Sequence, residues 1–430
     1  MTRAAARSTL PRPVHSDAAG NVVDGPAAAA AAMRSGARFL PLDPGELIPL
    51  PRGSLLFALP GRTAVAFTPE RGLAPLASCG AAAAFLPPGY SVFGLAAYES
   101  EADAPLLPLH CYAAVCLWRD ELCVPAARVE SDVKHDPGQF DDAALPALVA
   151  RLRERHPRNR LVDHLGANCA LRYGCANAKN LFHGRWECPV PVAPACNAAC
   201  VGCISAQPGA PIPSPQERLT FVPTVDDVIE FALPHLESAP RAMVSFGQGC
   251  EGEPLLQADL LEEVIRAVRR RTSRGTLHLN TNGSRPDVVE RLCAAGLDSI
   301  RVSTNSARRE PYHAYYRPIS YDFDAVVRSL EVAREHGLFT SVNYLAFPGF
   351  TDGDLEVVAL DGLIERTGLD MIQWRNLNID PEHYVALLGL AADAPARGMG
   401  RLLAELRERH PRLRHGYVNP PRESFAPSAS

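Results

Sequence analysis

The chain has 430 residues, enough to bury a large core, and its 47% hydrophobic and 21% charged residues are ordinary for a globular protein. A net charge of −5, with no basic cluster flanked by aromatic residues, argues against nucleic-acid binding. The N-terminus lacks the apolar stretch of a signal peptide, and the Ala-rich run at 27–33 is too short to span a bilayer. We therefore expect a cytoplasmic protein with neither nucleic acid nor membrane as a partner.

Residues 1–38 are rich in Ala, Pro, Ser and Gly, which predicts a flexible leader. Short apolar runs separated by Pro and Gly follow from 39 to 135, and this pattern predicts a β-rich N-terminal domain. Residues 136–184 are expected to form a helical connector, because 145–156 has helical spacing and a second helix is expected over 169–182.

Residues 185–410 alternate apolar, partly β-branched runs with helical segments, and 411–430 are expected to be a C-terminal tail. The expected strands lie at 187–194, 241–247, 276–283, 299–306, 339–349 and 371–378. The expected helices include 260–271, 287–296, 323–337 and 355–368. Six strand–helix units indicate an α/β fold with a parallel sheet and right-handed crossovers, either doubly wound or an open barrel. Polar residues crowd the carboxyl ends of the strands, where such folds place their chemistry.

The stretch ACNAACVGC at 195–203 follows the first of these strands and contains Cys196, Cys200 and Cys203. In a reducing compartment, cysteines are expected to be metal ligands or core residues rather than disulfides. Three thiolates in so short a loop can bind three corners of a [4Fe–4S] cube, which cysteine thiolates hold. The fourth iron would stay open to a small molecule, and an open position marks a reactive metal centre. For the cysteines alone, a zinc site with a distant fourth ligand is the alternative.

This C-x3-C-x2-C spacing resembles the signature of the radical S-adenosylmethionine (radical SAM) superfamily, and the resemblance extends over about 185–380. Gly252, Glu253 and Pro254 in "EGEP" are similar to the family's turn that receives the methionine amino group, although Glu251 replaces a glycine. The resemblance also assigns four residues to the cofactor pocket: Asn280 and Asn282 in "NTNG", and Ser303 and Asn305 in "VSTNS". Many members of the family have an aromatic residue just before the third cysteine, whereas this chain has Gly202 there.

The resemblance implies a partial (βα)6 barrel and two cofactors, a [4Fe–4S] cluster and S-adenosyl-L-methionine. In the family, the cluster receives an electron from a donor such as flavodoxin or ferredoxin. S-adenosylmethionine is then cleaved to methionine and a 5′-deoxyadenosyl radical, which removes hydrogen from the substrate. The protein positions the cofactor and excludes water, while the cofactor carries the reaction. We expect such an enzyme here, acting on an unidentified small molecule or peptide.

Polar side chains near the ends of the last two expected strands are predicted to face the reacting centre. These candidates are Asn343, Tyr344, Gln373, Arg375 and Asn376. We expect Arg375 to meet a substrate carboxylate or phosphate, and an ion pair that braces the barrel is the alternative. Side chains alternate along a strand, so the sequence leaves open which of two neighbours points inward.

Two further groups of residues have a functional and a structural interpretation. The first group consists of three tyrosines, Tyr312, Tyr315 and Tyr316. They have either a redox role near the radical or a structural role as a stack of rings. Candidates for an auxiliary iron–sulfur cluster are Cys169, Cys175 and Cys188, with a fourth ligand from Cys250 or from the group Cys111, Cys116 and Cys123. Against this cluster, cysteine is often only a small buried apolar residue. In addition, Cys169 and Cys175 would fall on different faces of one helix.

Two other functions are compatible with the motifs. A radical SAM methyltransferase is the nearest variant, although no cobalamin-binding domain is recognisable ahead of the barrel. A non-catalytic iron–sulfur sensor or electron carrier is the alternative from another class. The "GEP" and "VSTNS" motifs argue against a carrier, because a carrier has no use for a nucleoside pocket.

Overall fold

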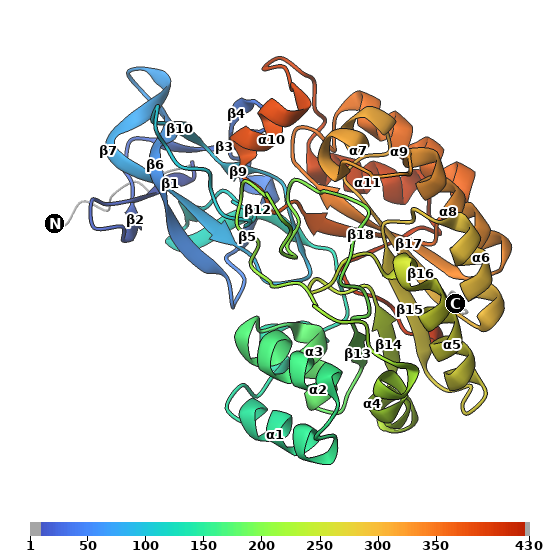
Figure 1. The fold of residues 1–430 in the computed structure, drawn as a ribbon. Helices are drawn as coiled ribbons and strands as arrows, with labels where there is room; N and C mark the ends of the chain where they lie inside the picture. Colours follow the sequence, from blue (N-terminus) through green and yellow to red (C-terminus); the bar gives the residue numbers. More distant parts are fainter. Residues whose placement is uncertain (1–9, 426–430) are drawn as a thin grey trace. The chain divides into compact units, whose positions relative to one another are not determined.

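The computed structural model describes residues 10–425, which form two compact units (Figure 1). Unit 1 comprises the chain up to Val129 together with Ala346–Val358 and Trp374–Pro411. Unit 2 comprises Glu130–Leu345, Ala359–Gln373 and the chain from Arg412 onward. Within residues 10–425, no helix combines the length and apolar character that crossing a bilayer requires.

Unit 1 contains a sheet of twelve strands in which every pairing is antiparallel. Its strands are β1 (Arg12–Ser16), β2 (Val22–Asp24), β3 (Ala30–Ser35), β4 (Arg38–Pro41), β5 (Leu47–Pro49), β6 (Leu55–Thr68), β7 (Gly72–Phe85), β8 (Tyr90–Val92), β9 (Leu95–Ala96), β10 (Tyr98–Ser100), β11 (Cys116–Trp118) and β12 (Glu121–Arg128). The long hairpin of β6 and β7 takes the third and fourth positions in the strand order β4-β3-β6-β7-β1-β11-β12-β5. The expected β-rich N-terminal region is therefore present.

The prediction of a flexible leader is wrong for the described residues 10–38. Strand β1 pairs with β7 and β11, and β3 pairs with β6. The Ala-rich run resembles low-complexity sequence, but its small side chains pack tightly: Ala31 is 3% exposed and Met33 is 8% exposed. Residues 1–9 of the predicted leader lie outside the described residues.

Unit 1 also includes helices α10 (Pro381–Leu388) and α11 (Met399–Arg409). The Asp380 carboxylate caps α10 by accepting hydrogen bonds from the backbone N–H groups of Glu382 and His383. It also forms an ion pair of 3.0 Å with Arg62 of β6, and both side chains are at most 3% exposed. This buried pair attaches α10 to the long hairpin of unit 1.

The connector at the start of unit 2 is helical, but it is more broken than predicted. Its elements are α1 (Leu145–Arg155), α2 (Arg160–His164), a π-helix (Leu165–Arg172) and α3 (Ala176–Phe182). The single helix expected over 169–182 is interrupted at Gly174, whose φ of +62° lies in the left-handed region that glycine favours.

The core of unit 2 is a parallel sheet whose seven strands lie in chain order. They are β13 (Glu187–Val190), β14 (Met243–Phe246), β15 (Thr276–Thr281), β16 (Ser299–Thr304), β17 (Phe339–Ala346), β18 (Met371–Asn376) and β19 (Arg414–Gly416). The helices of this region are α4 (Val225–Ser238), α5 (Ala258–Arg269), α6 (Pro286–Ala295), α7 (Arg309–Tyr316), α8 (Phe323–Glu335) and α9 (Asp354–Thr367). The six expected strands are confirmed, and together they give the mixed α/β fold with a curled sheet (Figure 1). Strand β19 pairs with β18, so the segment expected to be a C-terminal tail contributes a strand to this sheet.

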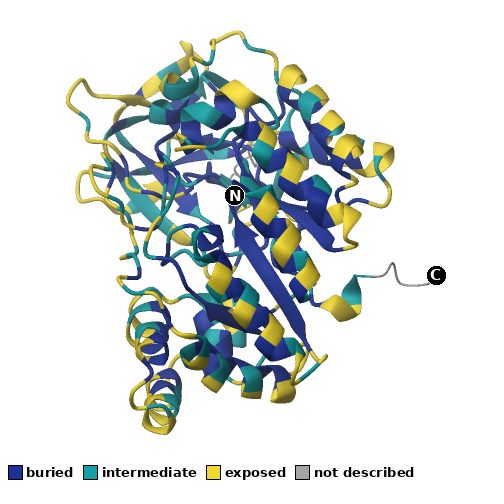
Figure 2. Ribbon diagram, turned by 45° about the vertical axis from the view of Figure 1, so that its right-hand side comes forward, coloured by how far each residue is buried: buried dark blue, intermediate teal, exposed yellow. Residues whose placement is uncertain are grey.

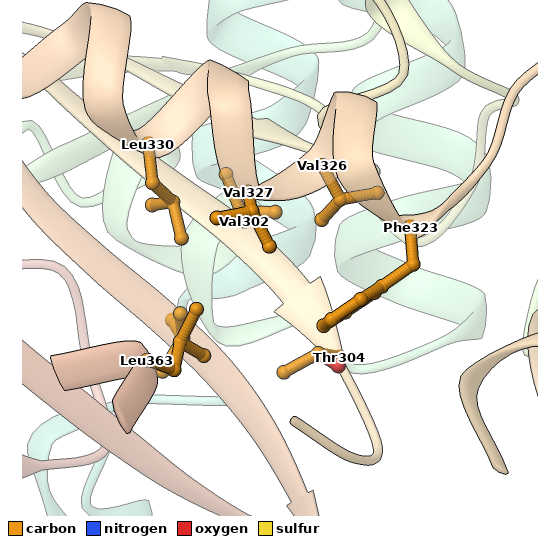
Figure 3. Close-up of a pocket in the computed structure, with 8 residues that line it drawn as sticks. Val302, Thr304, Phe323, Val326, Val327, Leu330 and Leu363 are labelled. Carbon is orange, nitrogen blue, oxygen red and sulfur yellow. The ribbon is translucent and has the colours of Figure 1, made fainter. Parts of the chain in front are cut away.

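The two faces of this sheet differ in polarity, as the alternation of side chains requires. Val302 and Thr304 of β16 and Val342 of β17 line a small apolar gap against α8 (Figure 3). This is the packing interface between sheet and helix, and the helices present exposed residues on their other side (Figure 2). The opposite face carries polar residues such as Arg301, whose guanidinium donates to Gln373 Oε1 at 2.8 Å. The interior of the curled sheet is therefore polar.

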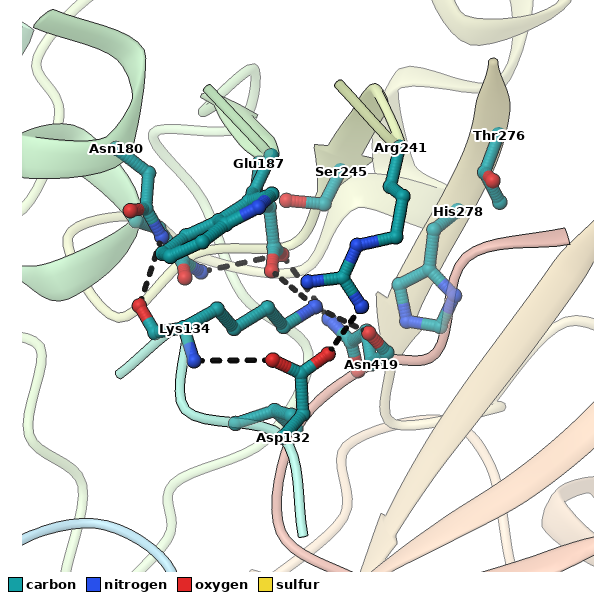
Figure 4. A network of polar contacts seen from close by, with 12 residues as sticks. Asp132, Lys134, Asn180, Glu187, Arg241, Ser245, Thr276, His278 and Asn419 are labelled. Carbon is teal, nitrogen blue, oxygen red and sulfur yellow. Dashed lines mark hydrogen bonds and ion pairs between the residues drawn. The ribbon is translucent and has the colours of Figure 1, made fainter. Parts of the chain in front are cut away.

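A buried network of charged and polar groups fills part of this interior (Figure 4). Lys134 lies 3.6 Å from Glu187 of β13, and their side chains are 4% and 0% exposed. Asn419, from the segment expected to be a tail, donates to Glu187 Oε1 at 3.1 Å, and its backbone carbonyl accepts from Lys134 Nζ. Burial raises the pKa of Glu187, but Lys134 and other nearby cationic or hydrogen-bonding groups outweigh it and lower that pKa to about 2. The carboxylate is therefore ionised at neutral pH.

Candidate functional site

The three-cysteine loop follows β13 and is fixed along its length by backbone hydrogen bonds. Ala199 and Val201 donate to the carbonyl groups of Tyr316 and Tyr315 at 3.1 Å and 2.9 Å, respectively. Ile319 donates to Asn197 at 2.8 Å, so the segment after α7 flanks the loop on the same side. The loop that contains Cys196, Cys200 and Cys203 is thus held in place by the fold.

The three thiols lie close enough to influence one another electrostatically. Burial raises the pKa of Cys200 well above its usual value, and the charges of Cys203 and Cys196 raise it further. Burial and the charge of Glu253 raise the pKa of Cys196 to about 11. Arg218 opposes both shifts, because a nearby cation favours the thiolate. A metal centre bound here would itself deprotonate the thiols.

The GEP turn approaches the cysteine loop so closely that glycine is required at position 252. A Cβ atom on Gly252 would lie 1.9 Å from the carbonyl oxygen of Ala195 and 3.0 Å from the backbone nitrogen of Cys196. Backbone hydrogen bonds also join the two segments: the Gly252 N–H donates to the carbonyl of Ala193 at 2.7 Å, and the Glu253 N–H donates to the carbonyl of Ala195 at 2.8 Å. The turn and the loop therefore form one rigid unit.

Glu251, which departs from the family motif, strengthens the same contact. Its carboxylate accepts hydrogen bonds from the backbone N–H groups of Val192 at 2.7 Å, Ala193 at 2.9 Å and Gln248 at 2.6 Å. Burial raises the pKa of Glu251 to about 8, although these three donors favour the ionised form. Glu251, which the family motif lacks, thus joins the backbone at the start of the cysteine loop to the backbone just before the GEP turn.

Glu253 joins the turn to the third motif. Its Oε1 accepts from the Thr281 hydroxyl at 2.5 Å and from the backbone N–H of Leu255 at 3.0 Å, while its Oε2 accepts from the backbone N–H of Asn282 at 2.8 Å. The Asn282 amide donates in turn to Asn197 of the cysteine loop at 2.8 Å. Burial raises the pKa of Glu253 to about 7. Three loops that are distant in sequence are thereby linked in a closed set of contacts.

Of the other residues assigned to the cofactor pocket, Asn280 donates to the carbonyl of Phe246 at 2.8 Å, and Pro254 begins the short helix Pro254–Gln257. Asn305 is buried and donates to the carbonyl of Pro311. Ser303 lies in register with Asn343 on the neighbouring strand, and the Asn343 amide donates to the Ser303 hydroxyl at 3.3 Å. The predicted ribose residue and the predicted substrate residue are therefore neighbours.

Because side chains alternate along a strand, the candidates for substrate contact lie on different faces of the sheet. Tyr344 is two residues from Val342, so it lies on the helix-facing side of the sheet, which argues against a contact with substrate. Gln373 points into the polar interior and donates to Asn419 Oδ1 at 3.0 Å. Arg375 and Asn376 belong to unit 1. The Asn376 amide is occupied by the β8 backbone, accepting from Val92 at 2.9 Å, which argues against a role in substrate binding.

The tyrosines of α7 form a buried stack beneath the cysteine loop. Tyr312 and Tyr316 are stacked with ring centroids 4.5 Å apart, and the hydroxyl groups of Tyr312 and Tyr321 are 3.1 Å apart. Sequence reasoning missed Tyr321. Burial raises its pKa, and the charges of Cys200, Glu253 and Cys196 add to the shift, which places the phenol beside the site. Arg218 was missed as well, and no motif marks either residue.

The predicted second cysteine group is only partly assembled. Cys169 and Cys250 lie with their sulfur atoms 3.4 Å apart. Cys188 follows Glu187 in β13, so its side chain points away from the polar interior that Glu187 enters, and it is fully buried. Cys116 and Cys123 belong to an apolar cluster in unit 1. Burial raises the pKa of Cys111 to about 12, which is typical of an inert core thiol.

Comparisons with known proteins gave one family model and several solved structures. Residues 190–361 match the family model described as the radical SAM superfamily. Comparison with curated proteins gave no match. Among solved structures, methylornithine synthase (PylB) is similar at 14% identity, with a TM-score of 0.37, over 64% of this chain and 74% of that chain. The FeFe-hydrogenase maturase HydG from Carboxydothermus hydrogenoformans is 14% identical, with a TM-score of 0.33, over 66% of this chain and 82% of that one. A radical SAM methyltransferase from Sphaerobacter thermophilus is 16% identical, with a TM-score of 0.32, over 48% of this chain and 64% of that one.

Proposed function

The chain belongs to the radical SAM superfamily through its residues 190–361, and on this premise we propose that it cleaves S-adenosylmethionine reductively and abstracts hydrogen from a substrate. The family uses a [4Fe–4S] cluster and S-adenosylmethionine. We assign the cluster to Cys196, Cys200 and Cys203, and the methionine end of S-adenosylmethionine to the turn at Gly252 and Glu253. These assignments rest on the contacts within unit 2.

The observation that carries the proposal is the closed set of contacts among the three motif loops. A loop with three thiols suits either a metal cluster or a zinc ion, but a zinc site does not require the rest of the arrangement. Here the thiol loop meets a glycine turn with no room for a Cβ atom, and Glu253 joins that turn to Asn282. A preorganised pocket beside the metal ligands suits a centre that must hold a second molecule.

The donor set fits the two groups. Three cysteines leave one iron of the cube without a protein ligand, which is the position that a chelating amino acid would take. Within residues 10–425, Glu253 Oε2 accepts a single hydrogen bond, from Asn282, so its second lone pair is available to an ammonium group. Asn343 Oδ1 is buried beside Ser303 and accepts no hydrogen bond within residues 10–425, so it can accept one from a ribose hydroxyl.

When bound, the cluster supplies the single electron that cleaves S-adenosylmethionine and so leads to 5′-deoxyadenosine. The chain's own residues bind and orient the two cofactors and shield them from water. Arg218 favours the thiolate forms of Cys196 and Cys200, and the aromatic stack of α7 keeps water from one side of the loop. We propose flavodoxin or ferredoxin as the electron donor and a small molecule or peptide as the substrate, with Asn343 as the best-placed polar contact in unit 2.

The proposal is tested first by cluster content and by the response of the cluster to S-adenosylmethionine. Anaerobically reconstituted protein is expected to bind about four iron atoms per chain at Cys196, Cys200 and Cys203, and a variant with all three changed to alanine is expected to lose them. Electron paramagnetic resonance of the reduced protein should change when S-adenosylmethionine is added, because the open iron gains ligands.

Cys293→Ser is the matched control, because Cys293 lies in α6, outside the three motif loops, and should leave both results unchanged. Zinc in place of iron at the three cysteines would contradict the proposal. A spectrum that does not change when S-adenosylmethionine is added would also contradict it.

A further inference from the structure

A second group of metal-ligating side chains lies in unit 2, and it shares no residue with the three cysteines of the proposed cluster. His164, Cys169 and Cys250 each offer one ligand atom, and these atoms all lie within 4.8 Å of one another. Cys169 and Cys250 are both buried, and their sulfur atoms are 3.4 Å apart. The three residues come from the end of α2, the π-helix and the loop before the GEP turn.

The π-helix explains how the first two residues meet. His164 and Cys169 are five positions apart, and in an α-helix such residues point about 140° away from each other. A π-helix forms its hydrogen bonds between residues five apart, which brings these positions to the same side, and such segments are frequent at functional sites. The hydrogen bond from the Tyr173 N–H to the Asn168 carbonyl shows this spacing at 2.8 Å.

The imidazole is oriented as a metal ligand would be. Its Nδ1 lies 3.2 Å from the side-chain amide nitrogen of Asn168. Turning this amide over brings its oxygen to the ring, so that Nδ1–H donates to it and Nε2 keeps its lone pair for a metal. Its Nε2 is buried and makes no hydrogen bond within residues 10–425. A buried nitrogen without a partner beside two thiols is costly unless something binds it.

The spacing suits one ion rather than a cluster. In a tetrahedral zinc site with zinc–sulfur bonds of about 2.3 Å, two sulfur ligands stand about 3.8 Å apart. The observed 3.4 Å is close to that separation. Ligands of a [4Fe–4S] cube bind different iron atoms and therefore stand much farther apart. Two thiolates with one imidazole are also a donor set typical of zinc.

We propose that His164, Cys169 and Cys250 bind a single zinc ion that joins the helical connector to the loop of the GEP turn. Cys250 directly precedes Glu251, and its carbonyl accepts a hydrogen bond of 2.7 Å from Leu219. An ion at Cys250 would therefore hold the loop that positions Glu251 and Glu253.

The test measures metal content in the full chain with Cys196, Cys200 and Cys203 changed to alanine, so that it does not depend on the proposed function. Protein produced anaerobically with zinc is expected to retain about one zinc per chain. Adding Cys169→Ser or Cys250→Ser should lower the zinc content at least about tenfold, whereas adding Cys188→Ser should leave it unchanged. Circular dichroism shows whether each variant is folded.

Cobalt substitution gives a spectroscopic result in the same triple-alanine chain. Co²⁺ added to the metal-free chain is expected to produce the intense absorption of a tetrahedral thiolate site, which Zn²⁺ then removes. Zinc below about one tenth per chain in folded protein would overturn the proposal. Residual iron of about four per chain would overturn it in favour of an auxiliary cluster. A Cys169–Cys250 disulfide in anaerobic protein would overturn it in favour of a redox pair.

Discussion

Changing Gly252 to alanine should lower the rate of 5′-deoxyadenosine formation about 100-fold, because a displacement of about 1 Å at a reacting centre has an effect of that size. The added Cβ would lie 1.9 Å from the Ala195 carbonyl oxygen, and backbone rather than a flexible side chain blocks it. Either the turn or the cysteine loop must move to relieve the contact. Both hold cofactor ligands in our assignment, so the distance between cluster and methionine group changes.

The measurement is the rate of product formation by reconstituted protein, together with its iron content. Gly362→Ala is the matched control, because a Cβ on Gly362 meets nothing within 4 Å and alanine favours the helix in which it lies. A Gly252→Ala enzyme as active as Gly362→Ala would show that the close approach of turn and loop is not needed for the reaction.

Changing Lys134 to methionine should destabilise unit 2 by about 3–5 kcal/mol, because it leaves a buried carboxylate without its cation. Glu187 is 0% exposed, and no hydrogen bond reaches its Oε2 within residues 10–425, so Lys134 at 3.6 Å supplies the compensating charge there. Urea unfolding followed by tryptophan fluorescence measures the change. Lys134→Met/Glu187→Gln should recover much of the loss, since the charge itself is then gone.

The second lysine of the chain is a natural control. Lys179 pairs with Asp142 at 2.6 Å, but that aspartate is 67% exposed, so Lys179→Met should cost only about 0–1 kcal/mol. Equal destabilisation by the two variants would contradict the role assigned to the buried pair.

The pH dependence of this pair has a definite sign. The pKa of Glu187 is about 2 in the folded chain against an ordinary value of 4.5. Its contribution to stability is therefore fully present above pH 4.5 and is lost as the pH falls from about 4.5 to 2. Removing Lys134 takes away the main group that lowers this pKa. The penalty of Lys134→Met should therefore shrink as the pH falls from 7 toward 4.5, because protonated Glu187 no longer needs a cation.

The parallel sheet was predictable because each strand is an apolar run followed by polar residues at its carboxyl end. The cysteine loop was predictable because its three cysteines lie within eight residues of sequence. The first strands of unit 1 could not be predicted, because their Ala-rich sequence has the composition of a flexible leader. Only the tight packing of residues such as Ala31 shows that this segment is folded. Strand β19 has three residues, too few to carry a periodic pattern.

Other features of the site depend on contacts that no local pattern records. Period-two alternation predicts that Asn343 and Tyr344 face opposite sides, but only the packing of Val342 against α8 decides which side is which. His164 and Cys169 are brought together by a π-helix, and helical spacing of the ordinary kind places them apart. Arg218 and Tyr321 reach the cysteines from other segments of the chain, so their roles follow from tertiary structure alone.

The most direct test of the central claim is the quantity of 5′-deoxyadenosine formed when anaerobic, reconstituted protein is given S-adenosylmethionine and dithionite. Chromatography of the native protein should show this product, and the variant with Cys196, Cys200 and Cys203 changed to alanine should show none. Absence of product from native protein with a fully loaded, reducible cluster that binds S-adenosylmethionine would contradict reductive cleavage by the isolated enzyme. Equal product from the two proteins would contradict the assignment of the cluster to these cysteines.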